Sequence, residues 1–493
     1  MAKPTIKKIA IYTLGALSGA LLTLSVQSYA NGQKEVLPVQ SLRTMAEVYG
    51  QIKANYVDNK NDDQILEGAL KGMVSNLDPH SEYLTVKDYA DLQESTTGEF
   101  GGLGMEIGAE EGFIKVVSPI EDTPAERAGV KSGDYIVKIN DESTRGMTST
   151  EAVKKMRGKP GTKITLTLSR KDASQPIVVH LTRAIIKVKS VRYKLLEPGY
   201  GYVRITQFQE RTVPTLVEAI DALHQENKAP LKGLVLDLRD DPGGLLNGAV
   251  GVSAVFLQPG AKVVSTKGRD KAEGMDLKAV PQDYLMSSGS DPLSTLPAEI
   301  KTIPITILIN SGTASASEIV SGALQDHKRA VVVGTQSFGK GSVQTVMPLS
   351  NGAAMKITTA LYYTPNDRSI QAQGIVPDVE VLDKKRLYES READLAGHIS
   401  NPFGGKETKG EIITQDQNSQ AASTPTNAAP DKSASSKNAD NEDDWLSRRD
   451  PNPAKDEQLK TALDLVKNPT KWQQSLGLAA KKPAKPLKKS SDD

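Results

Sequence analysis

Apolar residues recur at near-helical spacing in the first part of the chain. The stretches SLRTMAEVYGQIKANYV and ILEGALKGMVSNL each place an apolar side chain every three or four residues, which is the pattern of an amphipathic helix. Asp78-Pro79-His80 interrupts this pattern, because proline and turn-forming residues end helices. We therefore expect residues 41–96 to form an N-terminal helical region.

The pattern changes to short alternating strands near residue 98. MEIG and FIKVV are separated by a Glu-Glu-Gly turn, TSTEAVKKMRG has helical spacing, and KITLTLSR and QPIVVHLTR are two further strands. This pattern predicts a small, β-barrel-like α+β domain over residues 97–184. From about residue 190 to 381, apolar strands alternate with helical stretches, which predicts an α/β core over residues 185–403.

The N-terminus has the form of a secretory signal over residues 1–30. Three lysines open the segment, an apolar run extends to Val26, and Ser28-Tyr29-Ala30 offers small residues for cleavage. An uncleaved membrane anchor is the alternative, because the apolar run is at the lower limit of length for a membrane span. Both interpretations predict export of the remaining chain, to the periplasm or the cell envelope.

The C-terminal part of the chain is rich in Ser, Ala, Asn, Gln, Thr and Pro. This composition predicts a largely disordered, low-complexity tail over residues 404–493, with disorder over residues 406–440. Asp456–Val466 has the pattern of a short helix within the tail. The terminal KKPAKPLKK is either a solvated segment or a contact for anionic lipid, so association with a membrane surface is a further expectation.

Length and composition limit the function. The 493 residues predict two to four domains, and 61 basic minus 60 acidic residues give a net charge of +1. This charge gives no basic field for a phosphate backbone, so nucleic acid is not an expected partner. The chain has no cysteine, which excludes disulfides, thiolate zinc sites and cysteine nucleophiles.

A glycine-rich loop precedes the first strand of the middle domain. Gly101, Gly102 and Gly104 would let successive backbone N–H groups converge on an anion. Beside an exposed strand edge, such a loop can bind the carboxylate of a peptide C-terminus. A plain hairpin turn is the alternative for the glycines alone, and a dinucleotide loop would need a third glycine and a following helix. The whole pattern resembles a PDZ domain, with Gly102, Leu103, Gly104 and Met105 at the place of its carboxylate-binding loop.

Two turns of the α/β core carry candidate chemistry. Asp240-Asp241-Pro242-Gly243-Gly244 follows a predicted strand, and glycine backbone there can approach a reacting group, although a tight strand-to-helix turn is the alternative. Ser315 lies between the predicted strand Ile303–Ile309 and the predicted helix Glu318–Leu324. Its hydroxyl would be held at the sheet edge, near N–H groups that face a developing oxyanion. Ser315-Ala316-Ser317-Glu318 is also a capping box, which needs no chemistry.

A third segment contains a lysine between glycines. Gly334–Lys340 matches the first part of a Walker A loop, but Gly341 replaces the magnesium-binding Ser or Thr, and SVQTVMPL favours a strand instead of a helix. A serine nucleophile needs a base. Lysine can be that base when burial lowers its pKa from about 10.4 to about 7. Lys340 is therefore the candidate base for Ser315, and Gln344 would hold the lysine in place.

These segments, in this order, resemble the carboxy-terminal processing proteases, also called tail-specific proteases. The resemblance extends from about residue 45 to 381 and includes LDPHSEYL and GIVPDVEV. It implies that Ser315 is the nucleophile, Lys340 the general base and Gln344 the residue that orients the lysine. It further implies an oxyanion hole, formed by the following backbone groups: Gly243 or Gly244, and the N–H of Ala316.

Two further positions follow from the resemblance alone. Asp326 matches an acidic position of part of the family, which we interpret as structural because it would end a helix. Arg183, where the PDZ region ends, resembles an arginine that relays peptide docking to the active site.

The resemblance implies an exported serine endopeptidase whose PDZ domain holds the free C-terminus of a protein or peptide substrate. No metal or nucleotide cofactor is expected. A second copy of the chain, through helices in residues 41–96, and an adaptor protein are expected partners. The second hypothesis is a non-catalytic PDZ adaptor that binds C-terminal tails.

Overall fold

A computed structural model of the chain describes residues 38–110, 112–120, 122–269, 274–286, 289–383, 389–404, 407–410 and 450–477. The predicted signal segment, residues 1–30, and most of the predicted disordered segment, residues 406–440, lie outside these ranges. The chain divides into two compact units, residues 1–72 and residues 73–493.

The first unit contains helix α2 (Val39–Asn55) and most of helix α3 (Asp62–Ser75). Lys53, in the last turn of α2, forms an ion pair of 2.6 Å with Asp62, at the start of α3. No residue of α2 is buried, although the helix is amphipathic. Its exposed apolar side chains include Val39, Leu42, Met45 and Val48. At three-residue spacing each turns by about 60° relative to the one before, so together they spread over about half of the helix circumference.

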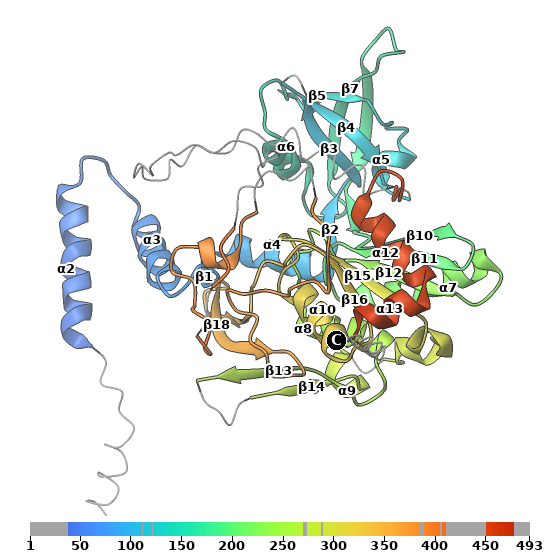
Figure 1. The fold of residues 1–493 in the computed structure, drawn as a ribbon. Helices are drawn as coiled ribbons and strands as arrows, with labels where there is room; N and C mark the ends of the chain where they lie inside the picture. Colours follow the sequence, from blue (N-terminus) through green and yellow to red (C-terminus); the bar gives the residue numbers. More distant parts are fainter. Residues whose placement is uncertain are drawn as a thin grey trace, which may run out of the picture. The chain divides into compact units, whose positions relative to one another are not determined.

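The middle domain is an antiparallel sheet with two helices (Figure 1). Alternating residues of its strands point into one core, in which Ile114, Ile136 and Leu166 are fully buried. β2 (Glu99–Gly102) and β9 (Ala184–Lys187) pair antiparallel where the chain enters and leaves the domain. The other elements are β3 (Met105–Glu110), β4 (Phe113–Pro119), α5 (Pro124–Arg127), β5 (Tyr135–Ile139), β6 (Glu142–Ser143), α6 (Ser149–Met156), β7 (Lys163–Ser169) and β8 (Ile177–Thr182).

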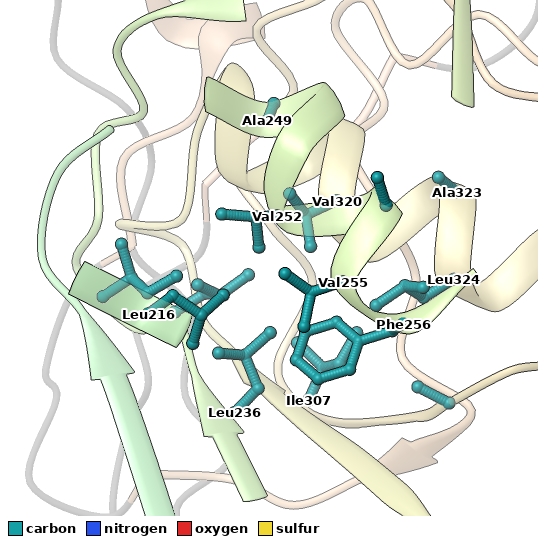
Figure 2. Close-up of a cluster of buried hydrophobic side chains, with 14 of the residues drawn as sticks. Leu216, Leu236, Ala249, Val252, Val255, Phe256, Ile307, Val320, Ala323 and Leu324 are labelled. Carbon is teal, nitrogen blue, oxygen red and sulfur yellow. The ribbon is translucent and has the colours of Figure 1, made fainter. Parts of the chain in front are cut away.

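The core is built on a six-stranded sheet of order β10-β11-β12-β15-β16-β19, parallel except at β10. Its strands are β10 (Val191–Glu197), β11 (Tyr200–Ile205), β12 (Gly233–Asp237), β15 (Ile305–Ile309), β16 (Val331–Gly334) and β19 (Val379–Glu380). One face is covered by α7 (Thr212–Asn227), α8 (Leu246–Phe256) and α10 (Ala316–Asp326). Figure 2 shows Leu236 and Ile307 of the sheet packed against Leu216, Val255 and Val320 of these helices.

Residues 450–477 cover the opposite face of the sheet, where the sequence predicted part of a low-complexity tail. They form α12 (Glu457–Lys467) and α13 (Pro469–Ser475), and Leu459 and Leu463 pack against Val235 and Leu308. This segment is therefore part of the folded core. The prediction anticipated the short helix but not its packing, because its polar surroundings in sequence gave no sign of a partner surface.

A second sheet lies beside the first and contains five strands. β18 (Ala354–Tyr363) pairs with β1 (Glu82–Leu84), β13 and β17. Residues 82–84, predicted as part of the helical region, are thus a strand, because β18 supplies a pairing edge that local sequence does not reveal. The remaining elements are α4 (Val86–Thr97), β13 (Lys262–Gly268), β14 (Asp276–Lys278), α9 (Pro281–Tyr284), β17 (Ser342–Pro348) and three short 3₁₀ helices (Pro292–Thr295, Ala298–Lys301, Glu392–Asp394).

Candidate active site

Three chain segments meet at one edge of the six-stranded sheet. β12, β15 and β16 are neighbouring parallel strands, and the carboxyl ends of parallel strands lie at the same edge. The segments that follow these strands contain the Asp240–Gly244 turn, Ser315 and Lys340. All three contribute to one cleft of about 950 Å³. Its walls also contain residues of α4, α8 and β17, the segment around Phe208, and His80, Lys356 and Tyr362.

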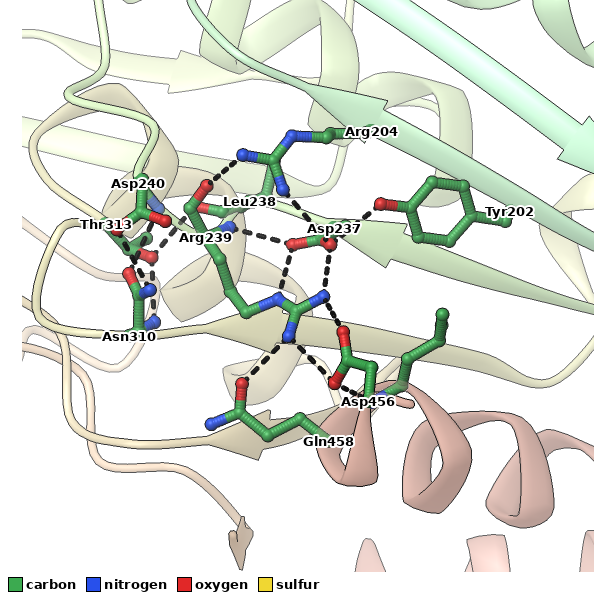
Figure 3. A network of polar contacts seen from close by, with 11 residues as sticks. Tyr202, Arg204, Asp237, Leu238, Arg239, Asp240, Asn310, Thr313, Asp456 and Gln458 are labelled. Carbon is green, nitrogen blue, oxygen red and sulfur yellow. Dashed lines mark hydrogen bonds and ion pairs between the residues drawn. The ribbon is translucent and has the colours of Figure 1, made fainter. Parts of the chain in front are cut away.

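Ser315 stands at a strained turn between β15 and α10. Its φ of +55° and ψ of −114° are rare for a residue other than glycine. Two hydrogen bonds join the segment before this turn to the segment that follows β12. The Thr313 hydroxyl donates to the Leu238 carbonyl at 2.8 Å, and the Asn310 side-chain amide donates to the Asp240 carboxylate at 3.0 Å (Figure 3). Such a strand-turn-helix arrangement presents a nucleophile at the top of a sheet.

The predicted oxyanion residues lie directly against this turn. A Cβ added to Gly243 would lie 2.8 Å from the Ala316 nitrogen and 2.8 Å from the Ser315 Cβ. The φ of Gly243 is +97°, and the Asp241 carboxylate fixes its N–H with a hydrogen bond of 2.9 Å. Only glycine allows this close approach. A Cβ added to Gly244 would instead lie 2.1 Å from the Phe208 carbonyl oxygen, so Gly243 is the glycine of this turn that packs directly against the serine.

Lys340 is half-buried in the wall of the cleft. Burial lowers its pKa below the ordinary lysine value, and the positive charge of Lys356 lowers it further. The nearby carboxylates act in the opposite direction; they are Glu392, Glu318 and Asp78. A lowered pKa enriches the neutral amine that a general base requires.

The glycines on either side of Lys340 allow backbone from other segments to pack closely around it. A Cβ on Gly341 would lie 2.7 Å from the Gln371 nitrogen, and a Cβ on Gly339 would lie 3.0 Å from the Gly374 nitrogen. SVQTVMP forms the strand β17 as predicted, instead of the helix that a nucleotide loop requires.

Gln344 lies in the same cleft as Ser315 and Lys340. The pairing of β17 with β18 shifts register between Val343 and Gln344, and bulges of this kind re-aim side chains next to active sites. The Gln344 amide donates to the Ser342 hydroxyl at 2.9 Å and to the Thr358 hydroxyl at 3.1 Å. Within the described residues, no hydrogen bond joins Gln344 or Ser315 to the Lys340 amine.

Three residues of this region were not assigned from the sequence. Glu318, fully buried, accepts hydrogen bonds from both the serine turn and the lysine loop. The Tyr362 hydroxyl bonds to carbonyls of both segments. The His80 ring bonds to the buried Glu392 at 2.8 Å. Glu318 appeared only as half of a capping box, and Tyr362 comes from a strand distant in sequence, which no local signal connects to Ser315.

The predicted carboxylate-binding loop precedes the edge strand β3 of the middle domain. Gly104 has a φ of +77°, and a Cβ there would lie 2.2 Å from the Thr123 Cβ. Neither the Leu103 nor the Gly104 N–H donates a hydrogen bond to a described residue. Gly102 ends β2, Leu103 is buried and Met105 begins β3. The four predicted residues therefore form the connection from β2 into the edge strand β3.

Arg183 and Asp326 lie away from the cleft. The Arg183 guanidinium donates to the Lys155 and Met156 carbonyls at 2.9 and 2.8 Å, where α6 ends. Asp326 ends α10 and binds the Arg368 side chain and the Asn366 N–H. Asp326 lies ten positions after Ala316 on this helix, about 15 Å along the axis.

The chain matches three known families. Peptidase family S41 matches residues 199–381, a PDZ domain matches residues 115–170, and the N-terminal domain of the activating protease CtpB matches residues 13–87. A carboxy-terminal-processing protease of Bartonella bacilliformis is 43% identical over 403 residues, which cover 80% of this chain and 88% of that protein.

Two further relatives are similar. The carboxy-terminal processing protease CtpA of Bacillus subtilis is 33% identical over 407 residues, which cover 79% of this chain and 82% of that protein. A solved structure of a photosystem II D1 C-terminal processing protease is 29% identical, with a TM-score of 0.37 and coverage of 68% of this chain and 92% of that chain. The chain therefore belongs to the carboxy-terminal processing proteases of peptidase family S41, and it is a serine-type peptidase with a PDZ domain that binds peptide substrates.

Proposed function

We propose that this peptidase cleaves its substrates with a Ser315–Lys340 dyad. One observation carries the proposal: the strained Ser315 turn, the half-buried Lys340 and the glycine backbone of residue 243 line a single cleft. The neutral Lys340 amine takes the proton from the Ser315 hydroxyl while Oγ attacks the carbonyl carbon of the scissile peptide bond. The resulting oxyanion accepts hydrogen bonds from the Ala316 N–H and from the Gly243 N–H, which must first leave the Asp241 side chain that it binds in this structure.

The second half of the reaction returns the same proton. The Lys340 ammonium donates it to the leaving amine as the carbon–nitrogen bond breaks, which leaves an ester on Ser315. Water then attacks the ester, Lys340 accepts a proton from that water, and the proton passes to Ser315 Oγ as the acid leaves. Gln344 is proposed to hold the lysine during these transfers by accepting an Nζ–H with its side-chain oxygen, while its amide nitrogen donates to Ser342 and Thr358.

Substrate selection is proposed to start at the PDZ domain. A peptide C-terminus would add a strand beside β3 and place its carboxylate at Leu103 and Gly104. The Arg183 guanidinium binds two carbonyls where α6 ends. We propose that through this contact Arg183 transmits peptide docking on the PDZ domain to the core. The substrate would thereby assemble the dyad that cleaves it.

Digestion of an unstructured protein tests the dyad. In the presence of EDTA, the wild-type enzyme is expected to cleave, and Ser315→Ala and Lys340→Ala are each expected to lose cleavage at least about a thousand-fold. Equal cleavage by all three proteins would contradict the proposal. A peptide with an amidated C-terminus tests the PDZ contact, because it is expected to be cleaved more slowly than the free acid.

Location and assembly follow from other parts of the chain. We propose export through the signal segment 1–30 and action on proteins of the cell envelope, with contact between the terminal lysines and a lipid surface. No helix in the described ranges is both long and apolar enough to cross a membrane. The exposed apolar side chains of α2 support the proposal of a homodimer through the N-terminal helices. An adaptor protein remains a proposed partner.

A further inference from the structure

Two buried side chains connect the chain segments that carry Ser315 and Lys340. The first is Glu318, on the first turn of α10. Its Oε2 accepts the Ser315 N–H at 2.8 Å and the Lys340 N–H at 3.0 Å. Its Oε1 accepts the Gly339 N–H at 2.7 Å and the Ser337 hydroxyl at 2.5 Å. One carboxylate thus receives four hydrogen bonds, of which three come from the lysine loop.

The second side chain is Tyr362, near the end of β18. Its hydroxyl lies 3.0 Å from the Ser315 carbonyl oxygen and also bonds to the Lys340 carbonyl. Burial and the nearby Glu318 and Glu392 carboxylates raise the pKa of Tyr362 well above its ordinary value, so the hydroxyl remains a donor. Its backbone N–H donates to the Gly341 carbonyl at 2.9 Å, which ties β18 to the lysine loop a second time.

A helix cap alone does not account for this arrangement. A capping glutamate at the third helical position needs to accept only from the N-cap N–H, whereas Glu318 also binds three groups of a loop that begins nineteen residues later. A fully buried carboxylate costs free energy, and replacement by apolar packing is often neutral or stabilising. Both shared contacts involve the backbone of residues 315 and 340, so their common effect is to fix the separation of these two residues.

We propose that Glu318 and Tyr362 are positioning residues that hold Ser315 and Lys340 at the separation required for proton transfer. This inference rests on the proposed function of the dyad. Glu318 accepts from the two N–H groups, and the single hydrogen of the Tyr362 hydroxyl is shared between the two carbonyls. A displacement of reacting groups by about 1 Å can reduce a rate by a factor of about 100, so a clamp on both residues has a direct effect on turnover.

Removal of the tyrosine hydroxyl is the main test. Tyr362→Phe keeps the ring and its packing, and kcat is expected to fall about ten- to hundred-fold while KM stays within about two-fold. Tyr363→Phe is the matched control, because the next ring on the same strand contacts Phe403 and Lys267 instead of the dyad. This control is expected to leave both constants unchanged.

The glutamate is tested by its pH profile. Burial raises the pKa of Glu318 itself to about 7, and where this carboxyl is ionised its charge raises the pKa of Lys340. Glu318→Gln keeps one acceptor and removes that charge. Lys356 acts in the opposite direction, while Glu392 and Asp78 also raise the pKa of Lys340 and are unchanged. The acidic limb of kcat/KM is therefore expected to move to lower pH as kcat falls at least ten-fold. Glu299→Gln, which removes a carboxylate that binds His224, is expected to leave the profile in place.

The outcomes separate this inference from the dyad. If Ser315→Ala is inactive but Tyr362→Phe retains the wild-type kcat, the clamp is overturned and the dyad stands. Full activity of Ser315→Ala would overturn the proposed function itself. If Glu318→Gln does not fold, Tyr362→Phe still decides. Where both variants fold, their double variant is expected to lose less than the product of the single losses, because they act on one distance; a multiplicative loss would contradict the shared role.

Discussion

The contact between α12 and the end of β12 gives a quantitative prediction. Arg239, two residues after β12, has a side chain only 3% exposed. Its guanidinium binds Asp237 at 2.6 Å, the Asp456 carboxylate at 2.8 and 3.2 Å, and Gln458 at 2.9 Å (Figure 3). Asp456 also accepts the Leu459 N–H at 3.0 Å and so caps α12. Asp456, 217 positions after Arg239 in sequence, thus supplies a negative charge to a buried arginine.

Asp456→Ala removes one of the two carboxylates from this guanidinium and leaves Asp237 in place. Two charge-assisted hydrogen bonds are lost, and the arginine stays buried with Asp237, which it shares with the buried Arg204; we expect this to cost about 3 kcal/mol of unfolding free energy. Loss of the helix cap adds about 1 kcal/mol. Asp456→Ser keeps a capping oxygen but is too short to reach Arg239, so it separates the two effects. Glu457→Ala is the control, because that side chain is 68% exposed and exposed ion pairs contribute little.

Urea unfolding can be followed through Trp472, on α13. Its indole N–H donates to the Ile305 carbonyl at 2.7 Å, so its fluorescence reports the docking of this segment on the sheet. The chain has two tryptophans, and Trp445→Phe leaves Trp472 as the single reporter. We expect losses of about 4, 3 and less than 0.5 kcal/mol for Asp456→Ala, Asp456→Ser and Glu457→Ala. Equal values for Asp456→Ala and Glu457→Ala would refute the reasoning.

Three shorter predictions concern the turn and the loop. Burial raises the pKa of Asp241 to about 8. Between about pH 4 and 8 the folded state therefore binds a proton that the unfolded state has released, so the free energy of unfolding falls as pH rises. Urea unfolding at several pH values should show a weaker fall for Asp241→Asn than for the wild type. Gly243→Ala places a Cβ 2.7 Å from the Ala314 carbonyl oxygen and should reduce kcat about 100-fold in a peptide assay; unchanged turnover would count against this oxyanion assignment. Gly104→Ala, which collides with Thr123, should weaken binding of a labelled C-terminal peptide at least ten-fold by fluorescence anisotropy, and equal affinity would exclude this loop.

The strands and helices that show a regular pattern of apolar and polar residues were predictable from the sequence. The strands of the PDZ domain alternate apolar and polar residues because each has one face on a core and one toward solvent. The elbow at Ser315 was predictable because an apolar strand and an amphipathic helix flank it closely. β1 and the packing of α12 were not, since each depends on a partner surface more than 140 residues away, in β18 and β12 respectively.

The same limit applies inside the candidate site. Nucleophile, base and oxyanion turn each follow a strand, and parallel neighbours bring strand ends together, so motif order alone points to one cleft. Ser-x-x-Glu, in contrast, has two physical meanings. A capping box needs only residues 315 and 318, which are three positions apart in sequence, whereas the clamp needs the N–H groups of Gly339 and Lys340, which only the fold supplies. The capping-box motif therefore identifies Ser315 as one partner of Glu318. The complete burial of the Glu318 carboxylate then indicates that it has further hydrogen-bond partners, which the motif does not reveal.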